Sequence, residues 1–182
     1  MAFNPNYHNR QSIRLNSYDY SKEGVYSFTI CTYNRRCLLG EIRDGKMILN
    51  SLGHLIQNEW YELTNRFEHI KLDEFVIMPN HTHGIIIIKK IEPTTNISDK
   101  SSVTNVGNTK IKIPTLGDII GSFKSLVYLK HLKESKSINP NLIVGTLWQR
   151  NYFERIILNN EDLDSIRHYI RNNPTRWLSD DL

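Results

Sequence analysis

The fold is decided by residues 76–88, which read Val-Ile-Met-Pro-Asn-His-Thr-His-Gly-Ile-Ile-Ile-Ile. The Pro-Asn pair predicts a turn between two apolar strands. Strand positions i and i+2 project from the same face, so we expect His81 and His83 on one face and Thr82 on the other. The apolar run that follows indicates a central strand buried on both faces. Two imidazoles on one face can hold a metal ion, although a catalytic metal needs a third ligand.

The patterns around this segment predict an α+β domain. Strand-like alternation or apolar runs occupy residues 25–33, 69–78 and 152–158, with a shorter strand at 143–148. Helical spacing of apolar residues occupies 51–66, 116–133 and 161–172, with Asn50 or Ser51 capping the first helix, Asn160 capping the last and Pro174 ending it. An Asp-Gly pair within residues 38–49 predicts a small hairpin. With that hairpin set aside, the order fits a ferredoxin-like split βαβ fold that has a central antiparallel sheet and helices on one face.

Composition places the chain among globular proteins. It has 182 residues, of which 39% are hydrophobic and 23% charged, and this suits one domain, expected over residues 25–178. We find no run of about 18 apolar residues and no N-terminal signal segment, so a soluble cytoplasmic protein without membrane association is expected. Cys31 and Cys37 are then expected to be reduced. The net charge of +4 permits an anionic partner such as nucleic acid without requiring one.

Two polar segments fall outside the periodic patterns. Residues 1–24 form a basic arm in which Arg10 and Arg14 either contact DNA or belong to a loosely held terminus. Residues 92–113 are rich in Thr, Asn, Ser and Lys and are expected to form a flexible loop insertion.

The last predicted helix supplies the groups that the histidine pair lacks. Tyr169 and Asn173 are four residues apart and therefore lie on one helical face. An amide oxygen is a hard ligand for Mg²⁺ or Mn²⁺, and a Tyr hydroxyl beside such an ion can act as a nucleophile. These two residues would complete a site with His81 and His83. Considered separately, each of these residues also has an ordinary structural interpretation. The histidines can be plain strand residues, the Tyr ring can pack against the sheet, and the Asn can be a common residue at a helix C-terminus.

This combination resembles the single-tyrosine HUH transposases of the IS200/IS605 type, and more closely the REP-associated tyrosine transposases. The resemblance covers most of the chain. Its motifs are Arg14 with Tyr18-Asp19-Tyr20, Phe28-Thr29-Ile30-Cys31-Thr32, Leu72 to His81, Phe123-Lys124-Ser125, Leu147 to Phe153, and Tyr169 to Pro174. One position departs from the family pattern, because a bulky apolar residue usually stands where this chain has Thr82. Since that side chain is expected to face away from the metal, we expect an effect on packing.

The resemblance implies an HUH endonuclease fold with a C-terminal catalytic helix and the cleavage and rejoining of single-stranded DNA. Tyr169 would form a 5′-phosphotyrosine, and His81, His83 and Asn173 would hold Mg²⁺ or Mn²⁺. The implied partner is single-stranded or hairpin DNA of REP-like repeats, in a bacterial, nucleoid-associated protein. A monomer is favoured over a dimer, although IS200-type relatives build shared sites from two subunits.

Further residues are candidates for DNA contact, each with a structural alternative. Lys124 contacts phosphate or is a solvated charge. The run of Trp148, Gln149 and Arg150 stacks on and binds a base, or is a packed Trp with solvated neighbours. Asp73 and Glu74 either support the metal ligands or lie at an exposed strand end. The competing function is a non-catalytic nucleic-acid-binding module of the same fold. A zinc hydrolase is disfavoured, because the chain has no His-Glu-x-x-His motif.

Overall fold

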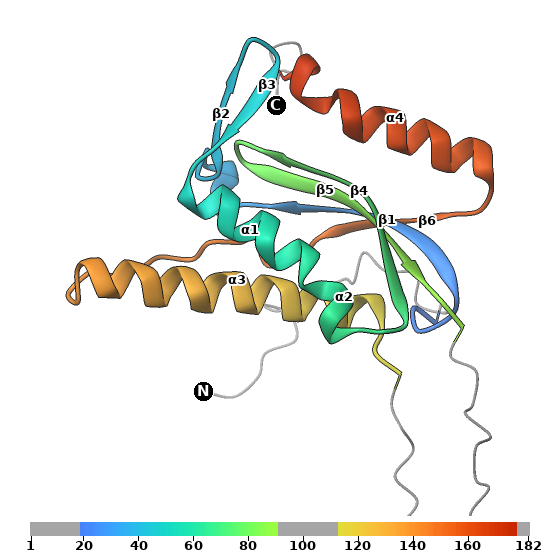
Figure 1. Ribbon diagram of the computed structural model, residues 1–182, viewed down its shortest axis with the longest axis horizontal. Coiled ribbons are helices and arrows are strands. Elements are labelled where there is room, and N and C mark those ends of the chain that lie inside the picture. The colour runs from blue at the N-terminus through green and yellow to red at the C-terminus, as the bar shows by residue number, and fades with distance from the viewer. Residues whose placement is uncertain (1–18, 91–112, 178–182) are drawn as a thin grey trace, which may run out of the picture.

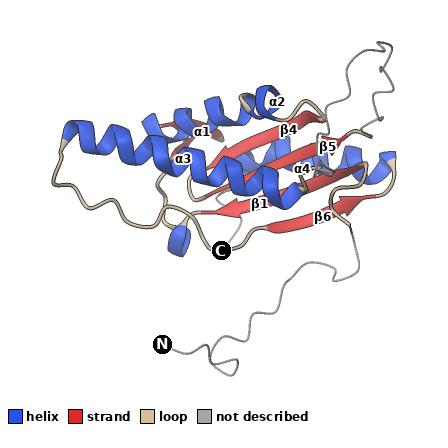
Figure 2. Cartoon of the chain, turned by 90° about the horizontal axis from the view of Figure 1, so that it is seen from below, coloured by secondary structure: helices blue, strands red, loops and turns tan. Residues whose placement is uncertain are grey.

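The computed structural model describes residues 19–90 and 113–177, which build an antiparallel sheet with helices on both faces (Figures 1 and 2). The four strands follow the order β4-β5-β1-β6. Their bounds are β1 Gly24–Cys31, β4 Ile70–Met78, β5 His81–Ile88 and β6 Phe153–Ile157. All three neighbouring pairs are antiparallel. The predicted α+β class with a central antiparallel sheet is confirmed, and β5, which carries the histidines, lies inside the sheet between β4 and β1.

The helices divide between the two faces of the sheet. Those on one face are α1 Ser51–Tyr61, α2 Leu63–Arg66 and α3 Leu116–Ile138, while α4 Asn160–Arg176 covers the other. Figure 1 shows α4 on one side of the strands and α1 and α3 on the opposite side. The expectation of helices on one face only is therefore wrong for α4. The physical reason is that β5 carries apolar side chains on both faces, so each face needs a cover.

The two faces have separate apolar cores. On the face of α1 and α3, Trp60 stacks on Phe75 with ring centroids 4.3 Å apart and is packed among other aromatic rings. On the opposite face, Ile85, Ile157 and Ile170 form a smaller cluster that joins α4 to the sheet. This smaller core places the helix that bears Tyr169 over the face that bears the histidines.

A two-stranded hairpin stands beside the sheet, as the Asp-Gly pair predicts. It consists of β2 Gly40–Arg43 and β3 Lys46–Leu49. The turn residues Asp44 and Gly45 both have positive φ, 50° and 69°. Such angles are typical of the tight turns whose twist matches that of the paired strands.

Several predicted boundaries differ from the structure. The strand expected over 143–148 is reduced to an isolated bridge between Trp148 and Thr32. The first strand ends at Cys31, because Tyr33–Arg35 forms a 3-10 turn. The last helix is capped by Asn159, one residue before the expected cap, and continues past Pro174 to Arg176. Pro removes one hydrogen-bond donor and strains the preceding turn, but the helix continues for only two residues beyond it.

The remaining boundary differences concern the long helices. The helix predicted over 51–66 is divided at Glu62 into α1 and α2, and α3 ends five residues later than expected, at Ile138. Most of the arm over 1–24, including Arg10 and Arg14, and nearly all of the loop over 92–113 lie outside the described residues. Among the helices that are described, none is both long and apolar enough to cross a membrane.

Candidate active site

The two histidines of β5 lie on the face covered by α4. Their ring centroids are 4.6 Å apart and their planes meet at 79°. Thr82, the residue between the two histidines in the chain, is fully buried. Its cross-strand neighbours, Ile30 and Ile77, belong to the core on the other face of the sheet. The predicted strand geometry of the His-Thr-His segment is therefore confirmed.

His83 belongs to a row of residues that runs straight across the sheet. The strand register pairs it with Val76 on β4 and with Thr29 on β1, and Thr29 pairs in turn with Phe153 on β6. Thr29 Oγ1 lies 2.7 Å from His83 Nδ1. Burial, with the neighbouring His81 second, lowers the pKa of His83 to about 3. The imidazole is therefore neutral at physiological pH, the form in which it can ligate a metal.

His81 is held in a defined orientation by Asn80, the second residue of the predicted turn. Asn80 Nδ2 donates to the backbone oxygen of Arg35 at 3.2 Å, which directs Asn80 Oδ1 toward His81 Nδ1 at 2.6 Å. Since Oδ1 can only accept, Nδ1 carries the proton and Nε2 carries the lone pair. A hydrogen bond at one ring nitrogen that orients the other is the usual support of a metal-binding histidine.

Tyr169 and Asn173 project from successive turns of α4 toward the histidines. The Tyr169 ring centroid lies 5.3 Å from that of His83, and its side chain is 42% exposed. Asn173 is 3% exposed, and no hydrogen bond involves its side-chain amide among the residues that the structure describes. One cavity of about 140 Å³ is lined by all four side chains. Residues predicted from two distant segments of the chain therefore meet at one point.

The donor set of this cavity fits a hard divalent ion. It offers two imidazole nitrogens and the amide of Asn173, an oxygen donor suited to Mg²⁺ or Mn²⁺. Cys31 also lines the cavity, but burial raises the pKa of its thiol, which keeps the sulfur protonated and disfavours it as a ligand. Within residues 19–90 and 113–177, no three His, Cys, Asp or Glu side chains come together as a metal site.

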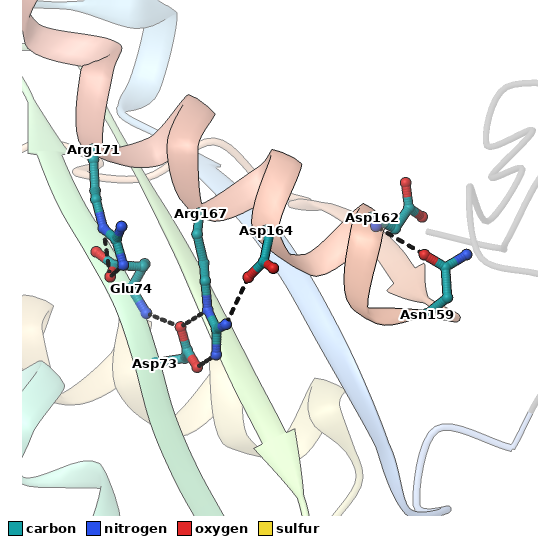
Figure 3. A network of polar contacts seen from close by, with 7 residues as sticks. All are labelled: Asp73, Glu74, Asn159, Asp162, Asp164, Arg167 and Arg171. Carbon is teal, nitrogen blue, oxygen red and sulfur yellow. Dashed lines mark hydrogen bonds and ion pairs between the residues drawn. The ribbon is translucent and has the colours of Figure 1, made fainter.

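Two ion pairs hold α4 against β4 (Figure 3). They come from Arg167 and Arg171, which are two residues before and two residues after Tyr169 in the chain. Arg167 binds Asp73 through two hydrogen bonds, Nε to Oδ1 at 2.9 Å and Nη2 to Oδ2 at 2.6 Å. Arg171 binds Glu74, with Nε 2.8 Å from Oε1. The hydrogen bond from Arg167 is the main reason that the pKa of Asp73 lies below its usual value.

A β-bulge makes these two ion pairs possible. Consecutive strand residues normally point to opposite faces. The pairing of β4 with β5 shifts register between Leu72 and Phe75, and both intervening carboxylates, Asp73 and Glu74, reach α4. These acidic residues therefore hold the tyrosine helix and do not contact the histidines, which corrects the interpretation of them as supports of the metal ligands. Bulges are known to redirect side chains next to functional sites.

Two of the predicted DNA contacts are structural in this fold. Lys124 Nζ donates to the backbone oxygens of Gln149 at 2.7 Å and Asn151 at 3.2 Å, so its charge is directed at the protein's own loop. Trp148 is 7% exposed and donates from its indole nitrogen to the Lys124 backbone oxygen at 3.2 Å. The ring is therefore packed and is not available to stack on a base. Gln149 is half-buried beside the site and Arg150 is exposed.

Thr29 and Asn80 support the histidines, and sequence reasoning did not single them out. Both were visible in the sequence as a strand residue and a turn residue. Only the pairing of β1 with β5 and the path of the turn bring them to the imidazoles. The Asn immediately before the His-Thr-His segment was the one local signal that could have been used.

Comparison with known proteins identifies a relative by sequence and solved structures with a similar fold. An uncharacterized protein of Haemophilus influenzae is 39% identical over 181 residues, which are 99% of this chain and 96% of that protein. A solved structure of a REP-associated tyrosine transposase bound to a REP hairpin superposes with a TM-score of 0.53 at 16% identity, over 91% of this chain and 74% of that one. No family model matches the chain.

Proposed function

This chain belongs to the same family as the uncharacterized Haemophilus influenzae protein, and we propose that it is a transposase-type enzyme that cleaves and rejoins single-stranded DNA. Its fold is that of a REP-associated tyrosine transposase. The observation that carries the proposal is the meeting of Tyr169, His81, His83 and Asn173 in one cavity. A nucleophile beside a set of metal ligands is the arrangement that phosphodiester cleavage through a covalent intermediate requires.

In the proposed reaction, the Tyr169 hydroxyl oxygen attacks a backbone phosphorus and loses its proton. The bond from phosphorus to the 3′ oxygen breaks, and that oxygen leaves as a hydroxyl after taking up a proton. The 5′ phosphate remains on Tyr169. Because a phosphodiester is exchanged for another phosphodiester, the free 3′ hydroxyl can reverse the step without a nucleotide cofactor. The 42% exposure of the Tyr169 side chain leaves room for a DNA strand to approach it.

The proposed ligands of the divalent ion are His81, His83 and Asn173. When bound, Mg²⁺ or Mn²⁺ supplies Lewis-acid polarisation of the scissile phosphate. Asn80 and Thr29 fix the orientation of the two imidazoles through their Nδ1 atoms. The apolar cluster under Ile170 and the ion pairs of Arg167 and Arg171 hold α4 so that Tyr169 stays next to His83.

The proposed substrate is a hairpin-forming repeat with single-stranded flanks. Its support is the shared fold with a transposase whose structure holds a REP hairpin, together with a net charge of +4. We also propose that the protein acts as a monomer. In favour of this, β5 and α4 of the same chain supply the nucleophile and all three proposed ligands, so one chain is sufficient to form the site.

Trapping the covalent intermediate tests the proposal. The protein is incubated with Mn²⁺ and hairpin oligonucleotides labelled on the 3′ side of candidate cleavage sites. We expect a labelled adduct that survives denaturation, and we expect Tyr169→Phe to abolish it while DNA binding is retained. Absence of an adduct on every hairpin, with binding intact, would favour the non-catalytic binding module instead.

A matched control is available in the same region of the fold. Tyr33 is similarly exposed, at 46%, and lies in the 3-10 turn that also contains Arg35, a residue of the site cavity. Tyr33→Phe should give a normal adduct. An adduct that persists in Tyr169→Phe and is lost in Tyr33→Phe would show that the nucleophile has been assigned to the wrong residue.

A further inference from the structure

We infer that Phe153, together with the side-chain amides of Gln149 and Asn151, forms a binding subsite for one DNA base next to the cleavage site. The inference rests on the proposed function and deepens it, because it assigns where a nucleotide beside the scissile phosphate is held. These residues come from the start of β6 and from the loop before it.

Phe153 stands at the end of the row that contains His83. Its partner across the strands is Thr29, the residue whose hydroxyl meets the His83 ring. With strands about 4.8 Å apart, two strand spacings place Phe153 roughly 10 Å from His83 along the same face of the sheet. Phe153 is 56% exposed, so its ring is open to solvent beside the site. An exposed ring at this place is suited to stack on a base.

A cavity of about 160 Å³ lies beside this ring. Its lining residues are Thr29, Cys31, Gln149, Asn151, Tyr152 and Phe153. It shares Thr29, Cys31 and Phe153 with the cavity that holds the proposed metal ligands. A larger cavity of about 400 Å³, between the sheet and α4, shares Thr29, His83 and Tyr169 with the cavity of the proposed ligands. The three cavities therefore adjoin one another around Thr29, and two of them border Tyr169.

The chemistry of the smaller cavity selects a base over a phosphate. All six of its lining side chains are uncharged, and two of them are amides that can donate and accept hydrogen bonds. The ammonium of Lys124 donates to the backbone oxygens of Gln149 and Asn151 in the same loop and is therefore engaged by the protein itself. A phosphate would need charged donors, whereas a base needs an aromatic face and neutral edge contacts.

The loop that carries these amides is already fixed in place. The Gln149 backbone N–H donates to the Cys31 oxygen at 2.9 Å, and the Tyr33 N–H donates to the Leu147 oxygen at 2.8 Å. The packed indole of Trp148 and the three-carbonyl contact of Lys124 hold the same loop from its other side. A preorganised subsite binds its ligand with a smaller entropic cost.

The test asks whether removal of the Phe153 ring and removal of one particular base disrupt the same contact. A fluorescein-labelled hairpin oligonucleotide with single-stranded flanks is prepared with one abasic replacement at each flank position in turn. Dissociation constants are measured by anisotropy in the Tyr169→Phe background, so that binding is read without cleavage. At one flank position we expect the abasic replacement to weaken binding by roughly 5- to 150-fold, the range for losing one stacked base.

Phe153→Ala should weaken binding of the intact hairpin by a similar factor, and the abasic replacement at that position should then have no further effect. Phe153→Trp should retain both the affinity and the abasic effect. The control is Tyr61→Ala, which removes an exposed aromatic ring from the end of α1 and should leave both unchanged. If the increases in dissociation constant caused by Phe153→Ala and by the abasic replacement multiply at every flank position, the ring and the bases act independently and the subsite is refuted.

The outcome separates this inference from the proposed function. If Phe153→Ala and one abasic replacement are coupled but no covalent adduct on Tyr169 can be trapped, the subsite is supported and the catalytic proposal is rejected. An adduct without coupling would keep the catalytic proposal and reject the subsite. If neither the wild type nor any variant binds the hairpins, both are overturned.

Discussion

Replacing Thr82 by Val should stabilise the protein without harming the site. The Thr82 hydroxyl is buried and makes no hydrogen bond within the described residues. Its cross-strand neighbours are Ile30 and Ile77, both part of the apolar core. Val has nearly the shape of Thr and prefers strands, so the substitution exchanges an unsatisfied polar group for a methyl group in an apolar setting.

The size of the effect follows from the cost of the unpaired hydroxyl. Burying such a group without a partner costs about 1–3 kcal/mol in mutational data. Some relaxation around Thr82 is expected, so we predict a gain of about 1–2 kcal/mol in the free energy of unfolding. For a chain of this size that gain corresponds to a rise in Tm of roughly 2–8 °C. Mn²⁺ affinity should not change, because Thr82 faces away from His81 and His83.

Thr32 provides a matched control with the opposite sign. It is also fully buried, but its hydroxyl lies 2.8 Å from the Arg36 oxygen and 2.9 Å from the Asn80 oxygen. Thr32→Val removes that donor and should lower the free energy of unfolding by about 1–3 kcal/mol.

Urea and thermal unfolding of the two variants and the wild type measure these changes, and titration calorimetry with Mn²⁺ measures the affinity. The reasoning would be refuted if Thr82→Val destabilised the protein as much as Thr32→Val does. It would also be refuted if Thr82→Val reduced Mn²⁺ binding as strongly as the loss of a proposed ligand.

Three further predictions concern the acid response, the packing of β5 and the metal. Asp73→Asn should cost about 1–2 kcal/mol near neutral pH, between the values for exposed and buried ion pairs, because Arg167 then keeps only the more exposed of its two carboxylate partners, Asp164. The pKa of Asp73 is lower in the folded than in the unfolded protein. Its contribution to stability is therefore complete above the unfolded pKa and is lost as the pH falls through the folded pKa. Unfolding measured at several pH values should show the stabilities of wild type and variant converging below about pH 4. Gly84→Ala should destabilise the fold by about 1–3 kcal/mol in urea unfolding, because an added Cβ would stand 2.6 Å from the Phe28 ring. His81→Ala or added EDTA should abolish adduct formation while anisotropy shows DNA binding largely unchanged; undiminished cleavage in EDTA would exclude the metal role.

The sequence by itself determined the directions of the side chains within each element. A period of two placed His81 and His83 on one face of a strand, and a period of 3.6 placed Tyr169 and Asn173 on one face of a helix. The Asp-Gly turn and the central position of β5 were likewise predictable. All of these depend on neighbours within a few residues, where sterics and alternation leave few choices.

The tertiary structure alone decided which surfaces meet. The packing of α4 on the histidine face, the bulge that turns both Asp73 and Glu74 toward α4, and the burial of Trp148 under Lys124 could not be derived from local patterns. Strand register and helix docking are set by the complementarity of apolar surfaces and ion pairs that are distant in the chain. A periodic pattern states only that a face must be covered, and the segment that covers it depends on how the whole chain packs.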